Sequence, residues 1–287
     1  MPRVPLYDAD GKPVQSEKTG KPLRIAASAW LDRYRPVEQM TWAPGEEMLL
    51  RDRLIAEGGW FPRRGVTCFN LYRPPLIGPG EPDEAERWLN HVHAVYRDDA
   101  EHIIHWLAHR VQRPEKLNHA LVLAASKEPA RILHWNRSNA RLARGTGQRR
   151  ARARILDSRF NAYLKSVILR ISEARDLGES DRLAFYDDMK AIIAAPPDVL
   201  RIHEKHVRAS NYSDNVVGVI ITTNHKSDGI YLPEDDRRHF IAWSPRKRSD
   251  FPDSYWRERW HYYSEEGGDC QTTIDKQPVL AQPGESP

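Results

Sequence analysis

Two strongly apolar runs of strand length stand out in the second half of the chain. Ser166–Glu173 forms the first and Val216–Asn224 forms the second. Both are rich in β-branched residues, and neither alternates polar with apolar positions as a half-exposed strand does. Uninterrupted apolar runs are typical of parallel strands whose two faces are both covered. The pattern therefore predicts an α/β fold with a mostly parallel central sheet flanked by helices.

Each of these runs ends with a polar residue. Glu173 ends the first run, and Asn224 ends the second. In open α/β sheets the ligand lies at the carboxyl ends of the strands. We therefore expect Glu173 and Asn224 to meet over one ligand, as in the core of a nucleotide-hydrolysing domain. The arginine pair Arg237-Arg238 follows the second run and adds candidate cations.

Periodicity and stop signals predict the remaining elements of this core. Apolar side chains at helical spacing define the helices, and prolines such as Pro114 end them. Short apolar runs between turn signals define the strands. The predicted elements are helices over residues 83–93, 98–113 and 181–194, strands over 117–124 and 239–243, and a strand or hairpin over 198–207.

The N-terminal part of the chain lacks such periodicity. Residues 1–80 are rich in proline and are interpreted as a loop-rich linker or the remnant of an upstream domain, with a short helix over Leu49–Ala56. Residues 81–116 are expected to form a helical lead-in to a core of residues 117–250. Residues 251–287 are expected to be a C-terminal extension that is partly disordered.

Basic charge is concentrated in one window of the chain. Residues 127–154 hold nine of the 44 lysines and arginines but one of the 40 acidic residues, so the remaining chain carries a net charge of −4. A basic tract of this kind suits a phosphate backbone. No apolar run reaches transmembrane length, Met1–Pro5 lacks a signal region, and two cysteines make no disulfide framework. We therefore expect a cytoplasmic protein with no membrane association.

A nucleotide-hydrolysing core of this type needs a glycine-rich loop after its first strand. The backbone amides of G-x-x-x-x-G-K-[ST] hold the phosphates, and its lysine reaches the terminal ones. Here residues 125–136 read A-S-K-E-P-A-R-I-L-H-W-N, and no glycine follows until Gly145. The Walker A lysine is therefore absent, and Pro129 disfavours the helix that should follow the loop.

The predicted helical lead-in is rich in histidine. His105 and His109 are four residues apart, so one helix face would hold both, which is the spacing of a metal-binding pair. No third ligand accompanies them. Polar or packing roles are therefore the favoured interpretation of these histidines.

Two stretches resemble the helicase domain of phage and prophage primase–helicase proteins, which are similar to superfamily 3 helicases. The first stretch is Trp88–Leu123. The second is Arg159–Trp243, with I-S-E-A-R-D-L-G at residues 171–178, I-I-T-T-N-H at 220–225 and D-D-R-R at 235–238. Together they cover a little over half of the chain and leave the stretch between them unmatched.

The resemblance implies a P-loop NTPase-like core of AAA+ type that binds ATP and Mg²⁺, acts on single-stranded DNA and assembles into a homo-oligomeric ring. It implies that Glu173 is the Walker B acid, which helps to hold Mg²⁺ or polarises the attacking water. Asn224 matches the sensor asparagine. Arg237 or Arg238 matches the arginine finger, which reaches the γ-phosphate bound by the neighbouring subunit. The family usually places a primase-like domain upstream, for which residues 1–80 are too short.

The genetic code offers an explanation for the unmatched stretch. Permitted codons for Ser126–Leu133, read in another frame, encode Q-G-T-G-K-D-T, the phosphate loop expected at this point. The same frame continues through Gln148 as a helix and turn in the style of the family. We therefore hypothesise that the segment from near Ser126 to near Arg150 is translated out of frame between compensating shifts.

The favoured function at this point is the helicase-type ATPase domain of a mobile-element DNA replication protein, with ATP hydrolysis weak or absent. Two alternatives stay open. A non-catalytic DNA-binding or ring-assembly module would keep the fold and use the basic tract of residues 127–154. A decayed gene fragment would give no stable product.

The frame hypothesis predicts the nucleotide sequence of the gene. The codons of residues 126–133 should contain CAA GGA ACC GGC AAG GAT ACT, or a synonymous string, in the shifted frame. Sequencing the gene tests this expectation directly. Codons that have no means of encoding Q-G-T-G-K in that frame would refute the hypothesis.

Overall fold

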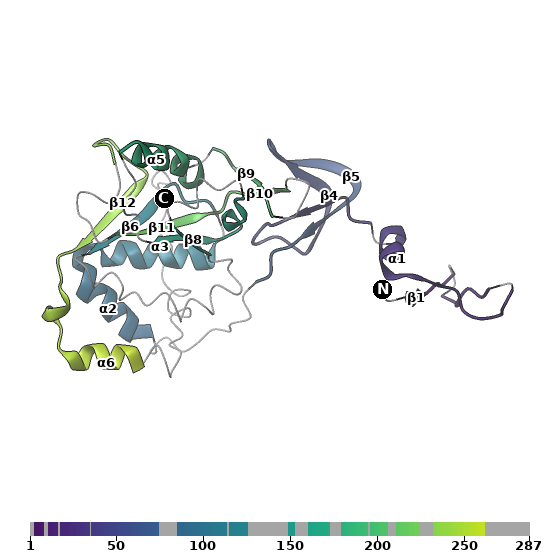
Figure 1. The fold of residues 1–287 in the computed structure, drawn as a ribbon, viewed down its shortest axis with the longest axis horizontal. Helices are drawn as coiled ribbons and strands as arrows, with labels where there is room; N and C mark the ends of the chain where they lie inside the picture. Colours follow the sequence, from purple (N-terminus) through teal and green to yellow (C-terminus); the bar gives the residue numbers. More distant parts are fainter. Residues whose placement is uncertain are drawn as a thin grey trace, which may run out of the picture.

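The computed structural model describes residues 3–8, 11–16, 18–34, 36–74, 85–113, 115–125, 149–152, 160–172, 179–194, 196–205, 211–223 and 232–261. Its larger part is a three-layer α/β core, and a small N-terminal sheet lies beside this core (Figure 1). A short arm precedes the small sheet. The arm contains β1 (Arg3–Pro5), β2 (Arg24–Ala26) and α1 (Ala27–Tyr34).

The core is built on a five-stranded sheet. The order of its strands is β12-β6-β11-β8-β7, and each neighbouring pair is parallel. Every residue of β6 and β11 is buried, which explains why both sequences are so strongly apolar. The prediction of an α/β fold with a mostly parallel central sheet is confirmed. The strands are β6 (Ala120–Ala125), β7 (Arg149–Arg152), β8 (Ile168–Ser172), β11 (Gly218–Thr223) and β12 (His239–Ser244).

Helices cover both faces of this sheet. On one face, α2 (Glu86–Tyr96) and α3 (Ala100–Gln112) share a buried cluster with Leu121 and Leu123 of β6, and Trp106 of α3 lies in the same cluster. The side chains of alternate strand residues point to opposite faces. The side chain of the residue between these two leucines therefore points to the opposite face of the sheet.

The second face is covered by α5 (Glu179–Ile193). Met189 of this helix is fully buried in a cluster with Val122 of β6 and with Val219 and Ile221 of β11. Two separate apolar clusters thus hold the sheet between its helices. This double cover is the reason that the strands lack a polar face.

Most of the elements predicted for the core are confirmed. The predicted helices correspond to α2, α3 and α5, and the predicted strands to β6, β8, β11 and β12. The segment predicted as a strand or hairpin, residues 198–207, contains the strand β9 (Val199–Ile202), and its antiparallel partner β10 (Asn211–Asp214) lies beyond the predicted bounds. The remaining elements are three 3₁₀ turns, η2 (Arg97–Asp99), η5 (Ala162–Leu164) and η6 (Arg248–Asp250), and α6 (Asp253–His261).

The expected helix over Leu49–Ala56 is wrong, because these residues form a strand. They are β4, which pairs antiparallel with β5 (Gly59–Asn70), and β5 also pairs with β3 (Gln39–Thr41). Leu50, Leu54 and Ile55 have helix-like spacing, but the ladder shifts its register near Asp52, whose φ is 59°. Pairing with a distant segment therefore overrides the local pattern, and this part of the chain is less loop-rich than expected.

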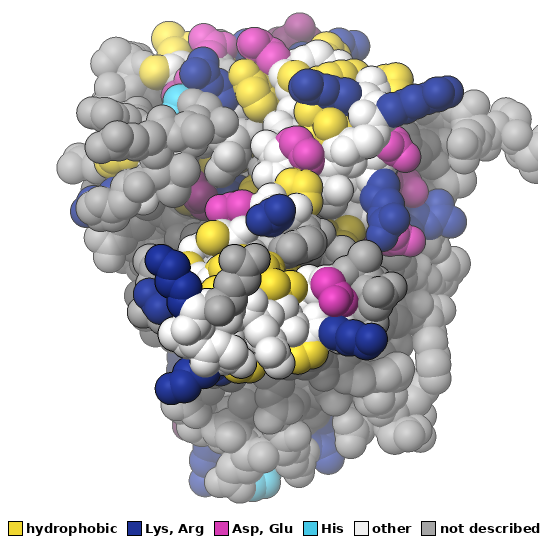
Figure 2. Space-filling view, turned by 90° about the vertical axis from the view of Figure 1, so that its right-hand side faces the viewer, with side chains coloured by type: hydrophobic (Ala, Val, Ile, Leu, Met, Phe, Trp, Pro, Cys, Tyr) yellow, Lys and Arg dark blue, Asp and Glu magenta, His cyan; other side chains and the backbone are white. Residues whose placement is uncertain are grey.

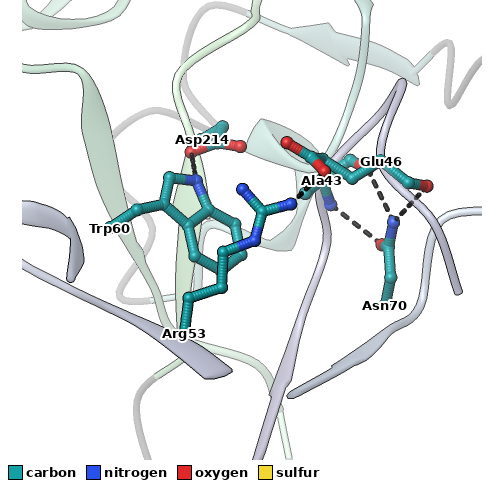
Figure 3. A network of polar contacts seen from close by, with 6 residues as sticks. All are labelled: Ala43, Glu46, Arg53, Trp60, Asn70 and Asp214. Atoms are coloured by element: carbon teal, nitrogen blue, oxygen red, sulfur yellow. Dashed lines mark hydrogen bonds and ion pairs between the residues drawn. The ribbon is translucent and has the colours of Figure 1, made fainter. Parts of the chain in front are cut away.

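Hydrogen bonds join the small sheet to the core through the β9–β10 hairpin. Thr41 Oγ1 donates to the Tyr212 carbonyl at 2.8 Å, and Ser213 Oγ donates to the Trp42 carbonyl at 2.7 Å. Figure 3 shows a second link, in which Trp60 Nε1 donates to Asp214 Oδ1 at 2.9 Å. The Arg53 guanidinium lies 4.7 Å from the centre of the Trp60 ring and pairs with Glu46.

The outer face of the small sheet carries apolar side chains between charges of both signs. Met40 is 52% exposed and Leu49 is 43% exposed. An open pocket of about 800 Å³ includes both residues together with Phe69, Asp32 and Arg51. Viewed from this side of the molecule, acidic, basic and hydrophobic side chains are interspersed (Figure 2). The described residues therefore form no path of single-sign charge on this face.

A buried arginine and a partly buried lysine hold the amino-terminal edge of the core. Arg110 is 1% exposed and donates to the carbonyls of Glu115 and Val216. Lys116 Nζ donates to the Ile192 carbonyl at the end of α5 and to Asn215 Oδ1 at 2.7 Å. Burial lowers the pKa of both Arg110 and Lys116. The segment that leads into β11 is thus fixed by charge-assisted hydrogen bonds to the Val216 carbonyl and to the Asn215 side chain.

Gly218 is predicted to be intolerant of a side chain. A Cβ atom there would lie 2.8 Å from Arg110 Nε and 3.0 Å from Trp106 Cη2, and both of these side chains are fully buried. Gly218→Ala should therefore lower the free energy of unfolding by about 1–3 kcal/mol. Urea unfolding measures the loss. Gly58→Ala is the control, because no atom lies within 4 Å of a Cβ there, and equal stability of the two variants would contradict this packing.

Lys116 is predicted to make stability depend on pH. Burial, followed by repulsion from Arg110, lowers its pKa to about 7, with attraction to Asp198 opposing the shift. An unfolded lysine titrates at about 10.4. Between these values the unfolded chain binds more protons, so the free energy of unfolding should rise with pH by up to about 1.4 kcal/mol per pH unit. Urea unfolding between pH 7 and pH 10 should show a smaller rise in the free energy of unfolding for Lys116→Met than for the natural chain. Parallel profiles for the two proteins would contradict this assignment.

Candidate functional site

The carboxyl ends of three core strands lie level with one another. Thr222 of β11 is opposite Leu123 of β6 on one side and opposite Ser172 of β8 on the other. One residue further, Thr223 is opposite Ala124. Neighbouring strands are about 4.8 Å apart, so the ends of β6 and β8 are about 10 Å apart across β11. The three strand ends therefore form one level edge of the sheet.

The predicted residues Glu173 and Asn224 follow this edge directly in the chain. Glu173 comes after Ser172, the last residue of β8, and Asn224 comes after Thr223, the last residue of β11. Both lie outside the described residues. The structure therefore brings together the strand ends that precede them, and their meeting over one ligand stays a prediction.

The predicted break in the phosphate loop begins at the same edge. β6 ends at Ala125, and residues 126–148 lie outside the described part of the chain. The strand ends carry small side chains, with Ala124, Ala125 and Thr223 all buried. None of these residues is a cation. These described strand ends thus supply no positive charge to bind phosphates.

The arginine pair lies at the opposite edge of the sheet. The Ala120 N–H, at the start of β6, donates to the Arg238 carbonyl at 2.8 Å, and His239 is opposite Ala120 in the ladder. Five residues of β6 separate this point from Ala125, a distance of about 16 Å. Arg237 and Arg238 therefore do not meet the ends of β8 and β11 within one chain.

The two arginines differ in their surroundings. The Arg237 side chain is exposed and forms no hydrogen bond or ion pair with another described residue. Arg238 is partly buried and lies near His239, whose pKa is lowered first by burial and to a smaller extent by repulsion from Arg238. Of the pair, Arg237 is the one whose guanidinium faces solvent. This difference in exposure depends on tertiary packing and was not predictable from the two adjacent positions in the sequence.

An acidic residue beside the arginines has a role that sequence reasoning missed. Asp236 accepts hydrogen bonds from Tyr186 Oη at 2.9 Å and from His239 Nδ1 at 3.0 Å. Burial by itself would raise the pKa of Asp236, but the hydrogen bonds from Tyr186 and His239 hold it below its usual value. Burial also lowers the pKa of His239, so the pair is an ionised carboxylate with a neutral imidazole. An Asp placed shortly before a strand was the available signal, because Asp commonly caps such turns.

The histidines of the lead-in lie in separate environments. His105 Nε2 is 3.9 Å from Glu101 Oε2, whereas His109 is buried. His102 Nε2 and His119 Nε2 are 3.0 Å apart, and the sequence did not suggest this contact. Within the described ranges no group of three or more His, Cys, Asp or Glu side chains is arranged to hold a metal ion.

Comparison with known proteins shows a shared fold. No protein-family model matches the chain, and neither does any curated protein. Three solved structures of the NrS-1 C-terminal region are similar to it, with TM-scores of 0.61, 0.59 and 0.61 at sequence identities of 18%, 16% and 15%. They match 84%, 91% and 97% of this chain.

The chain spans 55%, 62% and 66% of the length of those three structures. The likeness at this level of identity is one of fold. Of the helices that the structure describes, none has the length and apolar character needed to cross a membrane.

Proposed function

We propose that this chain is the helicase-type ATPase domain of a mobile-element DNA replication protein, and that loss of the Walker A loop leaves its ATP hydrolysis weak or absent. The observation that carries the proposal is the level arrangement of the carboxyl ends of β6, β8 and β11. Glu173 and Asn224 follow two of these ends directly. A nucleotide bound at this edge would have an acid and an amide beside it, next to the end of β6 where a phosphate loop would begin.

The residues of this edge fit part of Mg-ATP. Glu173 would hold Mg²⁺ or polarise the attacking water, and Asn224 would serve as the sensor of the terminal phosphate. The phosphates themselves find no partner of the expected kind. The residues after Ala125 supply neither a glycine-rich turn nor its lysine, and the described strand ends supply no cation. The residues of this edge therefore suit the Mg²⁺ ion of Mg-ATP, whereas the groups that would bind its phosphates are missing.

The position of the arginine pair supports action across a subunit interface. Arg237 lies at the amino-terminal edge, about 16 Å along β6 from the edge that would hold the nucleotide. An arginine so placed has no access to the nucleotide of its own chain. It is placed to reach the γ-phosphate bound by a neighbouring copy, as in a homo-oligomeric ring that moves along single-stranded DNA. We assign this role to Arg237 rather than to Arg238, because Arg237 is the exposed one.

The structural comparisons support the same direction. The NrS-1 C-terminal region shares the fold of this chain at 15–18% sequence identity. The parallel core and the arginine turn at its opposite edge are the features of this chain on which the proposed activity and partners rest.

Nucleotide binding tests the proposal. The natural chain should bind a fluorescent ATP analogue with Mg²⁺ at least roughly ten-fold more weakly than a version in which Q-G-T-G-K-D-T and its continuation replace the segment from Ser126 to Arg150, because the loop supplies the amides and the lysine that hold the phosphates. Fluorescence titration measures both affinities.

A version carrying Q-G-T-G-A-D-T is the control, and it should bind as weakly as the natural chain. Equal binding by the natural and restored chains would mean that residues 126–150 hold phosphates in another way, and the proposed loss of nucleotide binding would be refuted. Absence of binding in the restored chain would refute the proposed function.

A further inference from the structure

We propose that Asp236 is the positioning residue for Arg237, and that Tyr186 of α5 completes its support. The inference deepens the proposed function and rests on it, because there Arg237 is the arginine that reaches the neighbouring subunit. The observation that carries it is the set of hydrogen bonds around the Asp236 carboxylate. These bonds fix the turn from which Arg237 extends.

The carboxylate first organises the backbone that follows Arg237. Asp236 Oδ2 accepts the N–H of Arg238 at 3.2 Å and the N–H of His239 at 2.9 Å. The Arg238 carbonyl accepts the N–H of Ala120 at 2.8 Å, which ties the turn to the first residue of β6. Arg237 thus lies between two residues that are both held in place, while its own side chain is exposed.

Two side chains then fix the carboxylate itself. Tyr186 Oη donates to Asp236 Oδ1 at 2.9 Å, and His239 Nδ1 donates to Oδ2 at 3.0 Å. The side chains of Asp236 and His239 are 5% and 1% exposed. Rotation of the carboxylate would leave buried donors unpaired, which is unfavourable in this environment. The orientation of Asp236 is therefore strongly determined, and it depends on a hydroxyl group supplied by α5.

An arginine that acts across an interface needs a rigid backbone turn to hold it. The guanidinium has to meet the γ-phosphate of another chain in one orientation, and a displacement of about 1 Å is enough to reduce turnover by up to about a hundred-fold. Asp235 provides a matched comparison within the same turn. It is exposed and makes no hydrogen bond or ion pair with another described residue.

Complementation between two kinds of chain tests the inference. One chain is the restored version, with Q-G-T-G-K-D-T in place, carrying Arg237→Ala, so that it has a phosphate loop but no arginine to offer. The other is the natural chain, which has Arg237 but lacks the phosphate loop. Neither should hydrolyse ATP appreciably alone. In the mixture, turnover should appear at those interfaces where the natural chain supplies Arg237 to the restored site.

The Asp236 variants of the natural chain then measure positioning. Asp236→Asn keeps the shape of the side chain but replaces an acceptor oxygen with a donor, so its turnover in the mixture should fall at least roughly ten-fold, with the KM for ATP little changed. Asp235→Asn should complement as well as the natural chain. Rescue by Asp236→Asn equal to that of Asp235→Asn would overturn the inference.

Other outcomes separate the inference from the proposed function. If the restored chain with Arg237 intact does not hydrolyse ATP, the proposed function fails and the inference fails with it. If that chain is active but the natural chain gives no complementation, Arg237 does not act across the interface, so the role assigned to it and the inference are overturned while the ATPase assignment stands.

Tyr186→Phe guards against a folding artefact. It removes the hydroxyl donor alone from α5, and circular dichroism verifies that the variant is folded. If Asp236→Asn does not fold, Tyr186→Phe decides the question. A loss of complementation by this folded variant supports the positioning role, and full complementation by it contradicts the role assigned to Tyr186 and to the carboxylate orientation.

Discussion

The central strand β11 is paired on both sides, with β6 and with β8, and this double pairing determines where the ends of the core strands lie. Its six residues are all buried, and the register places Thr222 level with both Leu123 and Ser172. Arg110 holds the carbonyl of Val216 just before the strand begins, and Gly218 leaves the space that the Arg110 and Trp106 side chains occupy. A shift of one residue in this strand would exchange its two buried faces and misalign the edge at which the predicted site residues follow.

The two edges of the sheet carry different parts of the proposed chemistry. The carboxyl edge precedes Glu173, Asn224 and the segment in which the phosphate loop is missing. The amino edge carries Arg237 on a turn that is held by hydrogen bonds to the Asp236 carboxylate. In the proposed function, the chain has lost the phosphate loop that would bind its own nucleotide and has kept the arginine that it would offer to a neighbouring subunit. That combination is consistent with local damage confined to the segment after β6.

Sequence reasoning succeeded where burial dominates and failed where distant segments meet. The uninterrupted apolar runs of β8 and β11 were readable because a strand covered on both faces has no polar side. The β4 strand was read as a helix, since its partner β5 and the irregularity at Asp52 are not encoded in local spacing. The support of the arginine turn was missed for the same reason, because Tyr186 lies 50 residues before Asp236. The exposure of Arg237 relative to Arg238 likewise depends on tertiary packing.

The most direct measurement is a crystal structure of the restored chain with Mg²⁺ and a non-hydrolysable ATP analogue. The account predicts that the phosphates lie beside the end of β6, with Glu173 and Asn224 facing the metal and the terminal phosphate. It also predicts that the Arg237 guanidinium points to the nucleotide of an adjacent subunit and not to its own. A nucleotide bound elsewhere on the chain, or an Arg237 side chain that contacts the nucleotide of its own chain, would contradict the account.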